Sequence, residues 1–264
     1  MPTIERNKEI WDGAYQWANR GDEWSETWGG PNLQWYGSIL PRIFRFLPST
    51  HVLEIACGFG RWTNFLKDLS ENLSAIDLSE ECIEACKKRF EESSNIEFIL
   101  NDGKSLDKIA DESVDFVFSY DSLVHADRGV LDTYLSQMPR ILKPGGAVFI
   151  HHSNFGEYSS RVSSLRKYRR LEMLFEKLAL IEPTHMRDPN VTAEAVEQMA
   201  LDYGLQCVSQ EIVPWGTKRM HLDCFSTMIK AGSKHKRNNM VFRNSHFMQE
   251  ARNLARLSHL YDPR

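Results

Sequence analysis

Short apolar runs alternate with longer amphipathic stretches between Thr50 and Asn154. The apolar runs are typical of strands buried on both faces, and they read HVLEIAC, LSAIDL, IEFILND, VDFVFSYD and AVFIHH. Helical patterns such as RWTNFLKDL and SEECIEACKKRFEES separate them. Such alternation predicts an α/β fold with a parallel sheet covered by helices on both faces. A later helix-strand-strand pattern between residues 192 and 230 would complete a seven-stranded sheet.

Three regions lie outside this repeating unit. Residues 1–49 carry five of the seven tryptophans, which predicts an N-terminal helical lid rich in aromatic residues. Residues 155–190 read as a helical insertion after the fifth strand, and residues 233–264 as a basic helical tail containing FMQEARNLARLSHL. The predicted organisation is therefore a lid (1–49), a central domain (50–232, with the 155–190 insertion) and a tail (233–264).

A glycine-rich turn, LEIACGFGRW, joins the first strand to the first helix. Gly58 and Gly60 let the backbone turn sharply and approach a ligand where a Cβ would collide. Asp77 ends the second strand 17 residues after Gly60, where it can accept hydrogen bonds from ribose hydroxyls. A nucleoside cofactor follows. A dinucleotide site would want a third glycine where Thr63 stands.

The ordered set Glu54, Ala56, Gly58 and Gly60, then Asp77, NDG at 101–103 and LKPGG resembles class I S-adenosylmethionine-dependent methyltransferases over roughly residues 50–154. The resemblance implies a Rossmann-like, doubly wound, seven-stranded, mostly parallel sheet with an antiparallel last strand. It also implies S-adenosylmethionine as cofactor and S-adenosylhomocysteine as product. Ala56 departs from the family, which commonly has glycine there.

In that resemblance Gly58 and Gly60 lie near the methionine part, Asp77 on the ribose, and Asp102 with Gly103 beside the adenine. The full set of predicted cofactor-binding residues is Glu54, Ala56, Gly58, Gly60, Thr63, Asp77, Leu78, Asp102, Gly103, Ser119 and Tyr120.

The ends of the fourth and fifth strands, FSYDSLVHAD and FIHHSN, carry the acceptor-side candidates. The NPPY-like or DPPY-like element that amino-group methyltransferases of nucleic acid use does not follow the fourth strand. No catalytic cysteine precedes the acceptor site, which weakens the case for methylation of cytosine at C5. An O-methyltransferase is therefore favoured. His151 or His152 is the predicted general base, because neutral imidazole suits proton removal near neutral pH. Adjacent strand residues face opposite sides, so we expect only one of them to face the acceptor. A structural role remains the alternative for either one.

A rival interpretation uses Asp121, His125 and the two histidines to bind a divalent ion that lowers the acceptor hydroxyl's pKa. Mg²⁺ prefers oxygen ligands, so Asp121 with sugar hydroxyls and water would be its site. The structural alternatives are a helix cap for Asp121 and a surface position for His125.

Aromatic residues of the lid are candidates for substrate binding, through stacking on sugar rings, while Asp22 and Glu23 accept hydrogen bonds from hydroxyls. The alternative is that tryptophans anchor an N-terminal helix to the sheet. The predicted substrate-binding residues are Trp24, Trp28, Trp35 and Tyr36.

The segments GDEWSETWG, LPRIFRFLP, LEIACGFGRWT, IHHSN, SQEIVPW and LDCFSTM together resemble a bacterial branch of these enzymes associated with polysaccharide methylation. This resemblance implies O-methylation of a carbohydrate in polysaccharide biosynthesis. A phenolic or antibiotic precursor is the alternative acceptor.

Composition restricts the expected binding partners and cell compartment. The 264 residues have a net charge of −4 and a pI near 6.2, which gives no general attraction to nucleic acid or anionic membranes. The five cysteines lack metal-site spacing, the N-terminus is too polar for a signal peptide, and no apolar run approaches a membrane span. We therefore expect a soluble cytoplasmic enzyme acting on a small molecule or saccharide. RNA binding through the tail and a homodimer through its leucines are further hypotheses.

Overall fold

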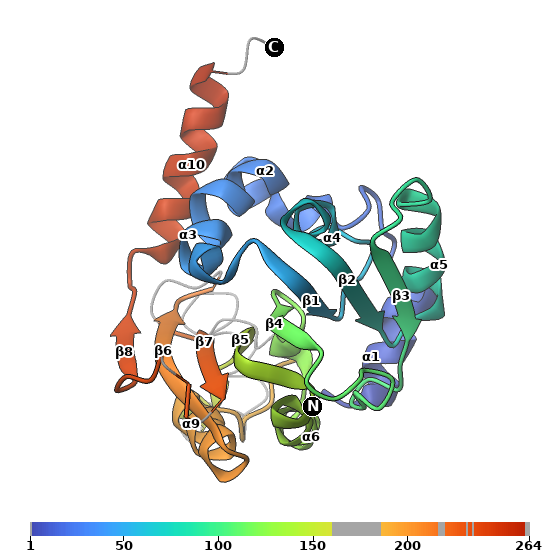
Figure 1. Cartoon of the computed structure of the whole chain (residues 1–264). Helices are drawn as coiled ribbons and strands as arrows, with labels where there is room; N and C mark the ends of the chain where they lie inside the picture. Colours follow the sequence, from blue (N-terminus) through green and yellow to red (C-terminus); the bar gives the residue numbers. More distant parts are fainter. Residues whose placement is uncertain (1, 160–185, 216–219, 231, 234, 262–264) are drawn as a thin grey trace.

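The computed structural model describes residues 2–159, 186–215, 220–230, 232–233 and 235–261. Within them the chain forms one eight-stranded sheet with strand order β3-β2-β1-β4-β5-β7-β6-β8 (Figure 1). The strands are β1 (Ser49–Ile55), β2 (Ser70–Asp77), β3 (Ile96–Leu100), β4 (Val114–Ser119), β5 (Leu142–Ser153), β6 (Leu205–Val213), β7 (Asp223–Lys230) and β8 (Met240–Arg243).

Strands β1 to β5 pair with one another in parallel, as the uninterrupted apolar runs predict. Strand β7 is antiparallel to both β5 and β6, whereas β8 is parallel to β6. The α/β, Rossmann-like architecture is confirmed, but the expected number of seven strands is wrong. The tail predicted as helical begins with the edge strand β8, and only then forms α10 (Phe247–Tyr261).

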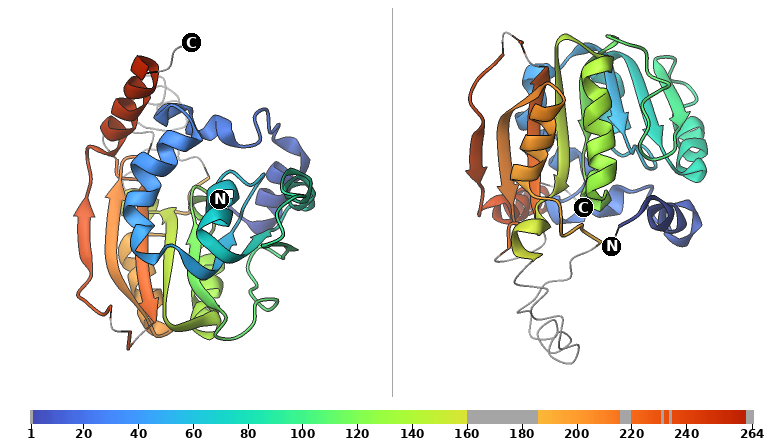
Figure 2. Two further views of the ribbon diagram at one scale, coloured as in Figure 1. Left: turned by 45° about the horizontal axis from the view of Figure 1, so that its top comes forward. Right: turned by 90° about the horizontal axis from the view of Figure 1, so that it is seen from below.

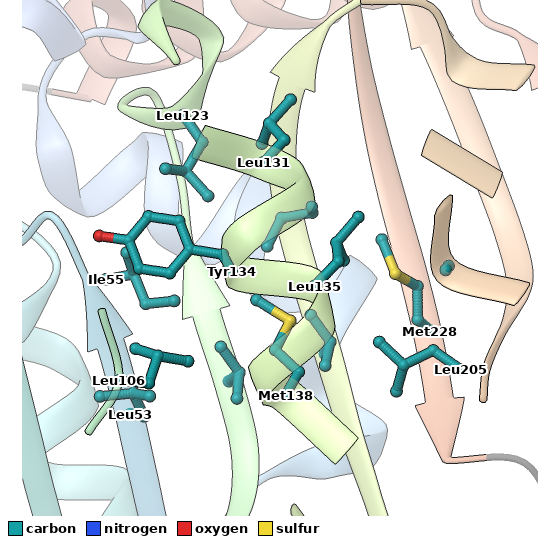
Figure 3. Packing of buried hydrophobic residues seen from close by; sticks show 14 of the residues in the cluster. Leu53, Ile55, Leu106, Leu123, Leu131, Tyr134, Leu135, Met138, Leu205 and Met228 are labelled. Atoms are coloured by element: carbon teal, nitrogen blue, oxygen red, sulfur yellow. The ribbon is translucent and has the colours of Figure 1, made fainter. Parts of the chain in front are cut away.

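Helices cover both faces of the sheet (Figure 2). On one face, α6 (Arg128–Ile141) and α9 (Ala193–Asp202) pack on β1, β4, β5, β6 and β7. Figure 3 shows α6 contributing Leu131, Leu135 and Met138 to this apolar core, opposite Leu53 of β1 and Met228 of β7. The helix α5 (Glu80–Arg89) packs beside β2 and β3, and Ser79 caps it by accepting the N–H of Cys82, as its Ser-Glu-Glu start predicts.

The other face carries the N-terminal elements and α10. Here α3 (Leu40–Ile43) and the short helical turns η2 (Asp22–Trp28) and η3 (Trp35–Ile39) form a second core with α10 and the β4, β5 and β7 strands. The helix α2 (Pro31–Gln34) lies beside η2, η3 and α10. Trp28 and Trp35 are 2% and 1% exposed within that core. The α10 helix lies on these elements, with Ala255 and Leu254 close to Gly29 and Gly37, and its end extends beyond the sheet (Figure 1).

The first helical segments lie elsewhere. The helix α1 (Ile4–Glu9) and the π-helical turn η1 (Ile10–Ala14) sit at the end of the sheet near α5, apart from α2 and α3 (Figure 2). Further short elements are η4 (Phe44–Phe46), α4 (Thr63–Leu66), η5 (Lys67–Leu69), η6 (Leu123–His125) and η7 (Phe155–Tyr158).

Of the insertion predicted for residues 155–190, the turn η7 and residues 186–190 are described. Its basic run, Arg161, Arg166, Lys167, Arg169 and Arg170, lies outside the described residues. None of the helices that the structure describes is long and apolar enough to cross a membrane.

Candidate active site

A cleft of about 1040 Å³, measured with its open mouth, lies at the carboxyl ends of β1, β2 and β4. The strand order reverses between β1 and β4, and open α/β sheets bind their ligands at such a switch point. The cleft walls come from the loop after β1, the residues after β2, β3 and β4, the start of α6, and the N-terminal segment. The lining residues from that segment are Ile4, Asn7, Trp11, Trp17, Gly21 and Trp24.

The loop after β1 needs three left-handed backbone positions. Gly58 and Gly60 have φ of 55° and 81°, and Ala56 has φ of 60° although it carries a Cβ. This position is the one where the resembled family commonly has glycine, and its conformation explains that preference. Both Ala56 and Gly58 line the cleft, whereas Gly60 packs underneath, against Phe90 and Cys86.

Asp77 stands at the end of β2, where the sequence predicts it, and lines the cleft. Its two carboxylate oxygens accept the backbone N–H groups of Gly58 (2.8 Å) and Ser79 (2.9 Å). Burial raises the pKa of this carboxyl above its usual range, although those two hydrogen bonds act in the opposite direction. The carboxylate therefore holds the glycine loop, and Asp77 lines the cleft together with Leu78.

The residues after β3 form the far end of the cleft. Gly103 lines it as predicted, but Asp102 does not. The Asp102 carboxylate instead accepts the backbone N–H groups of Lys104 (3.0 Å) and Ser105 (2.6 Å), and closes the loop locally. Asn101 and Tyr134 line this end and are joined by a 3.1 Å hydrogen bond from the amide nitrogen to the phenol oxygen. Sequence reasoning quoted Asn101 within NDG without giving it a role, and it missed Tyr134.

Three other predicted cofactor residues support the loop from below. Thr63 donates its hydroxyl to Glu54 at 2.5 Å, and Ser119 donates its hydroxyl to the carbonyl of Ile55. All three side chains are buried outside the cleft. Burial raises the pKa of Glu54 to about 8, with the Thr63 hydroxyl acting against that rise.

Asp121 and His125, both predicted from the sequence as acceptor-side residues, line the cleft after β4. Asp121 has φ of 63°, and its carboxylate binds the guanidinium of Arg61 at 2.8 Å. Arg61 also reaches the Ser25 hydroxyl at 3.3 Å and lies 4.4 Å above the ring of Trp62. Sequence reasoning missed Arg61, whose only signal is its place directly after the second glycine.

His125 is half-buried in the cleft wall. Its backbone carbonyl accepts a hydrogen bond from the side-chain amide of Asn7 (2.8 Å), and its ring centroid lies 5.9 Å from that of Trp11. The N-terminal segment is thus attached directly to the acceptor side.

His151 and His152 are fully buried and neither lines the cleft. His152 lies between the Ser226 hydroxyl (2.7 Å) and the Ser153 carbonyl (2.8 Å), and burial lowers its pKa to about 4. His151 points to the opposite face, where its Nδ1 accepts the backbone N–H of Asp121 at 3.1 Å. The structure therefore separates both imidazoles from direct contact with an acceptor in the cleft.

The donor set does not fit the metal interpretation. Among the described residues, no group of three or more His, Cys, Asp or Glu side chains is placed to hold a metal ion. The Asp121 carboxylate, proposed as the site for Mg²⁺, is paired with Arg61, and His125 supplies nitrogen where Mg²⁺ prefers oxygen.

The aromatic residues of the lid divide between two roles. Trp24 lines the cleft and is 39% exposed, as expected for a substrate-binding residue. Trp28 and Trp35 lie in the core and take the anchoring role that was the alternative, while Tyr36 is 64% exposed outside the cleft. Trp11 and Trp17, which were not predicted as binding residues, line the cleft instead.

Residues 52–146 match a protein family described as a methyltransferase domain. The matched range, less than half of the chain, thus resembles a methyltransferase domain and includes the loop after β1 and Asp77. A methyltransferase domain of this kind implies S-adenosylmethionine as the cofactor.

Curated relatives of this methyltransferase domain include phosphoethanolamine N-methyltransferase 1 of Triticum aestivum, 32% identical over 56% of this chain and 28% of the relative. Phosphoethanolamine N-methyltransferase 3 of Arabidopsis thaliana is 28% identical over the same shares. The chain thus spans less than a third of the length of these relatives.

Solved structures share the fold. A protein of Pyrococcus horikoshii has a TM-score of 0.53 and 21% identity, covering 77% of this chain and 95% of its own. The cyclase SpnF has a TM-score of 0.61 and 14% identity, covering 87% and 97%. A fold that also serves a cyclase does not by itself define the acceptor chemistry.

Proposed function

We propose that this domain transfers the methyl group of S-adenosylmethionine to a hydroxyl group of a saccharide bound at the Asp121–His125 end of the cleft. The observation that supports this most is the placement of His125, Asp121 and Trp24 in the same cleft as Gly58 and Asp77. Cofactor and acceptor groups can thus meet without a change of site.

The cofactor supplies an electrophilic methyl group on a sulfonium sulfur. We expect Asp77 to bind the ribose, Gly103 and Asn101 to contact the adenine, and the peptide of Gly58 to lie against the methionine part. All four line the cleft. The Trp17 indole, stacked on Phe59 at 4.4 Å between centroids, covers this position from the N-terminal segment.

Methylation of a hydroxyl requires alignment and removal of a proton. We assign the removal of this proton to the His125 imidazole, in place of His151 and His152. His125 lines the cleft, whereas the other two histidines are buried away from it. Asp121 is suited to orient the hydroxyl as a hydrogen-bond acceptor, since its charge is already balanced by Arg61.

The aromatic rings of the remaining wall suit a saccharide. The rings of Trp11 and Trp24, which line the cleft, lie 6.0 Å apart. Behind them Tyr15, 5.3 Å from each ring, donates its phenol to Glu23 at 2.9 Å. Aromatic rings beside a carboxylate are typical of sites that bind sugar rings and their hydroxyls. The resemblance of the sequence to polysaccharide methyltransferases supports the same acceptor class.

An amine is the second candidate acceptor. The curated relatives are named as phosphoethanolamine N-methyltransferases, and electron-rich indole faces also attract ammonium groups. The same histidine would then remove a proton from nitrogen instead of oxygen.

The test is methyl transfer from trideuteromethyl S-adenosylmethionine to a panel of sugars and sugar nucleotides, phosphoethanolamine and other amines, and phenols, read by mass spectrometry. We expect product with saccharides, at an unchanged rate in EDTA. Product from amines or phenols alone would overturn the saccharide assignment, and loss of activity in EDTA would restore the metal interpretation.

A further inference from the structure

Behind the acceptor end of the cleft, five charged or titratable residues form a continuous buried series. They come from five separate segments of the chain, and each contacts the next through its side chain, except that His151 contacts the backbone N–H of Asp121. In order from the core to the cleft they are Arg187, Asp223, His151, Asp121 and Arg61.

The inner end of this series is rigid. Arg187 binds Asp223 through two hydrogen bonds of 2.6 Å, from its Nε and one terminal nitrogen to the two carboxylate oxygens. Both side chains are almost fully buried. Burial alone would raise the pKa of Asp223, but Arg187 holds it well below its usual range, so the carboxylate stays charged. A two-point ion pair of this kind fixes orientation as well as charge.

His151 lies between this carboxylate and the peptide of Asp121. Its Nε2 lies 3.3 Å from Asp223, and its Nδ1 accepts the backbone N–H of Asp121 at 3.1 Å. Because Nδ1 is the acceptor, the ring proton belongs on Nε2, facing the carboxylate. The rings of Trp215 and Phe225, with centroids 4.7 and 4.6 Å away, hold the imidazole from the sides.

The outer end of the series is strained. Asp121 has φ of 63°, a left-handed conformation that is unfavourable for residues with a Cβ. Its backbone N–H is bound by His151, and its carboxylate binds Arg61 in the cleft wall. Such a conformation persists only where surrounding contacts determine it, and His151 supplies the contact to the strained peptide.

We propose that His151 is a positioning residue: by accepting the peptide N–H of Asp121 it fixes the Asp121 carboxylate and Arg61 at the acceptor end of the cleft. His151 touches neither cofactor nor acceptor. Its place at the end of β5, beside the end of β4, follows from the parallel pairing of these strands. The part of the inference that concerns turnover rests on the proposed function.

A matched pair of variants separates the two ring nitrogens. His151→Asn retains an acceptor oxygen where Nδ1 lies, whereas His151→Gln retains a donor where Nε2 lies and loses that acceptor. We expect kcat with the acceptor to fall roughly 30-fold in His151→Gln and only about 3-fold in His151→Asn, the scale of one lost hydrogen bond to a buried group. Binding of S-adenosylhomocysteine should stay within about twofold in both, measured by calorimetry.

A purely structural role predicts another pattern: equal losses in both variants, in step with loss of cofactor binding and of thermal stability. That result, or full activity in His151→Gln, would overturn the proposal.

A second measurement on the wild-type protein needs no activity. In ¹⁵N-labelled protein, we expect His151 to show an unprotonated Nδ1 and a protonated Nε2, with scalar coupling between Nδ1 and the backbone nitrogen of Asp121 across the hydrogen bond. A protonated Nδ1 would refute the positioning role. If these signals are present but no acceptor is methylated, only the proposed function fails.

Discussion

Gly60, in the loop after β1, lies directly against the ring of Phe90, which follows the last residue of α5. A Cβ on Gly60 would fall 3.1 Å from the Cys86 sulfur and nearer still to the Phe90 ring. The backbone φ of 81° is itself unfavourable for any other residue. Because Gly60 has no Cβ, the loop after β1 can pack directly against Phe90 and Cys86.

Gly60→Ala should therefore lose both stability and cofactor binding. Gly204→Ala is the matched control, because Gly204 has φ of 82° with open space around its Cβ position. We expect about 1 kcal/mol of destabilisation in the control and roughly 2–4 kcal/mol in Gly60→Ala, measured by urea unfolding. Affinity for S-adenosylhomocysteine should fall in Gly60→Ala alone. Equal behaviour of the two variants would show that the loop does not depend on this contact.

Ala56→Gly should not lower the free energy of unfolding, although introducing glycine usually does. Ala56 has φ of 60°, so glycine removes left-handed strain of roughly 1–2 kcal/mol while adding about 0.5–1 kcal/mol of unfolded-state entropy. We expect unchanged or slightly raised stability in urea unfolding. A loss greater than about 1 kcal/mol would contradict the strain at this position.

Glu54→Gln should change how stability depends on pH. Burial raises the pKa of Glu54 to about 8 from an ordinary 4.5, so the unfolded chain releases this proton at lower pH than the folded one. The wild type then loses stability as pH rises from about 4.5 to 8, whereas the variant has no proton to release. We expect the variant to gain on the wild type across that window, by on the order of a few kcal/mol at pH 9.

Urea unfolding at pH 5, 7 and 9 measures this, with the exposed Glu91→Gln as a control for removing one negative charge. A constant difference between Glu54→Gln and the wild type over this range would disprove the raised pKa.

Trp24→Ala and Trp28→Ala should separate binding from anchoring. Trp28 is buried in the core with Trp215 and Phe247, so its truncation should cost about 3–5 kcal/mol of stability. Trp24 lines the cleft, so Trp24→Ala should keep stability within about 1 kcal/mol and raise the acceptor KM about 3–10-fold. Urea unfolding curves and steady-state kinetics measure the two effects. A large stability loss in Trp24→Ala, or an unchanged acceptor KM in that variant, would contradict its role in binding.

The regular part of the fold follows from local pattern. The apolar runs that predict strands correspond to β1 to β5, and the helical pattern that starts at Ser79 corresponds to α5. Strand β8 was missed because its four residues, all exposed, lie among lysine, arginine and asparagine, and it forms only by pairing with the edge of β6. Such pairing depends on tertiary structure, which local propensity does not encode.

Asp77, Asp121 and His125, which the sequence places at or after the ends of β2 and β4, all line the cleft. Prediction failed where the direction of a side chain mattered. His151 and His152 end an apolar strand, as a base would, but neighbouring strands and helices close over both faces of that strand. Trp11 and Trp17 line the cleft whereas Trp28 and Trp35 lie in the core, and this difference depends on tertiary packing that no local pattern reveals.

The most direct test of the central claim is the rate of methyl transfer to the accepted substrate in His125→Gln and His152→Gln, with S-adenosylhomocysteine binding measured beside it. With the base in the cleft wall, kcat should fall by at least about 100-fold in His125→Gln and stay within about 5-fold of wild type in His152→Gln, with cofactor affinity unchanged in both. Full turnover in His125→Gln together with inactivity of a folded His152→Gln would contradict it.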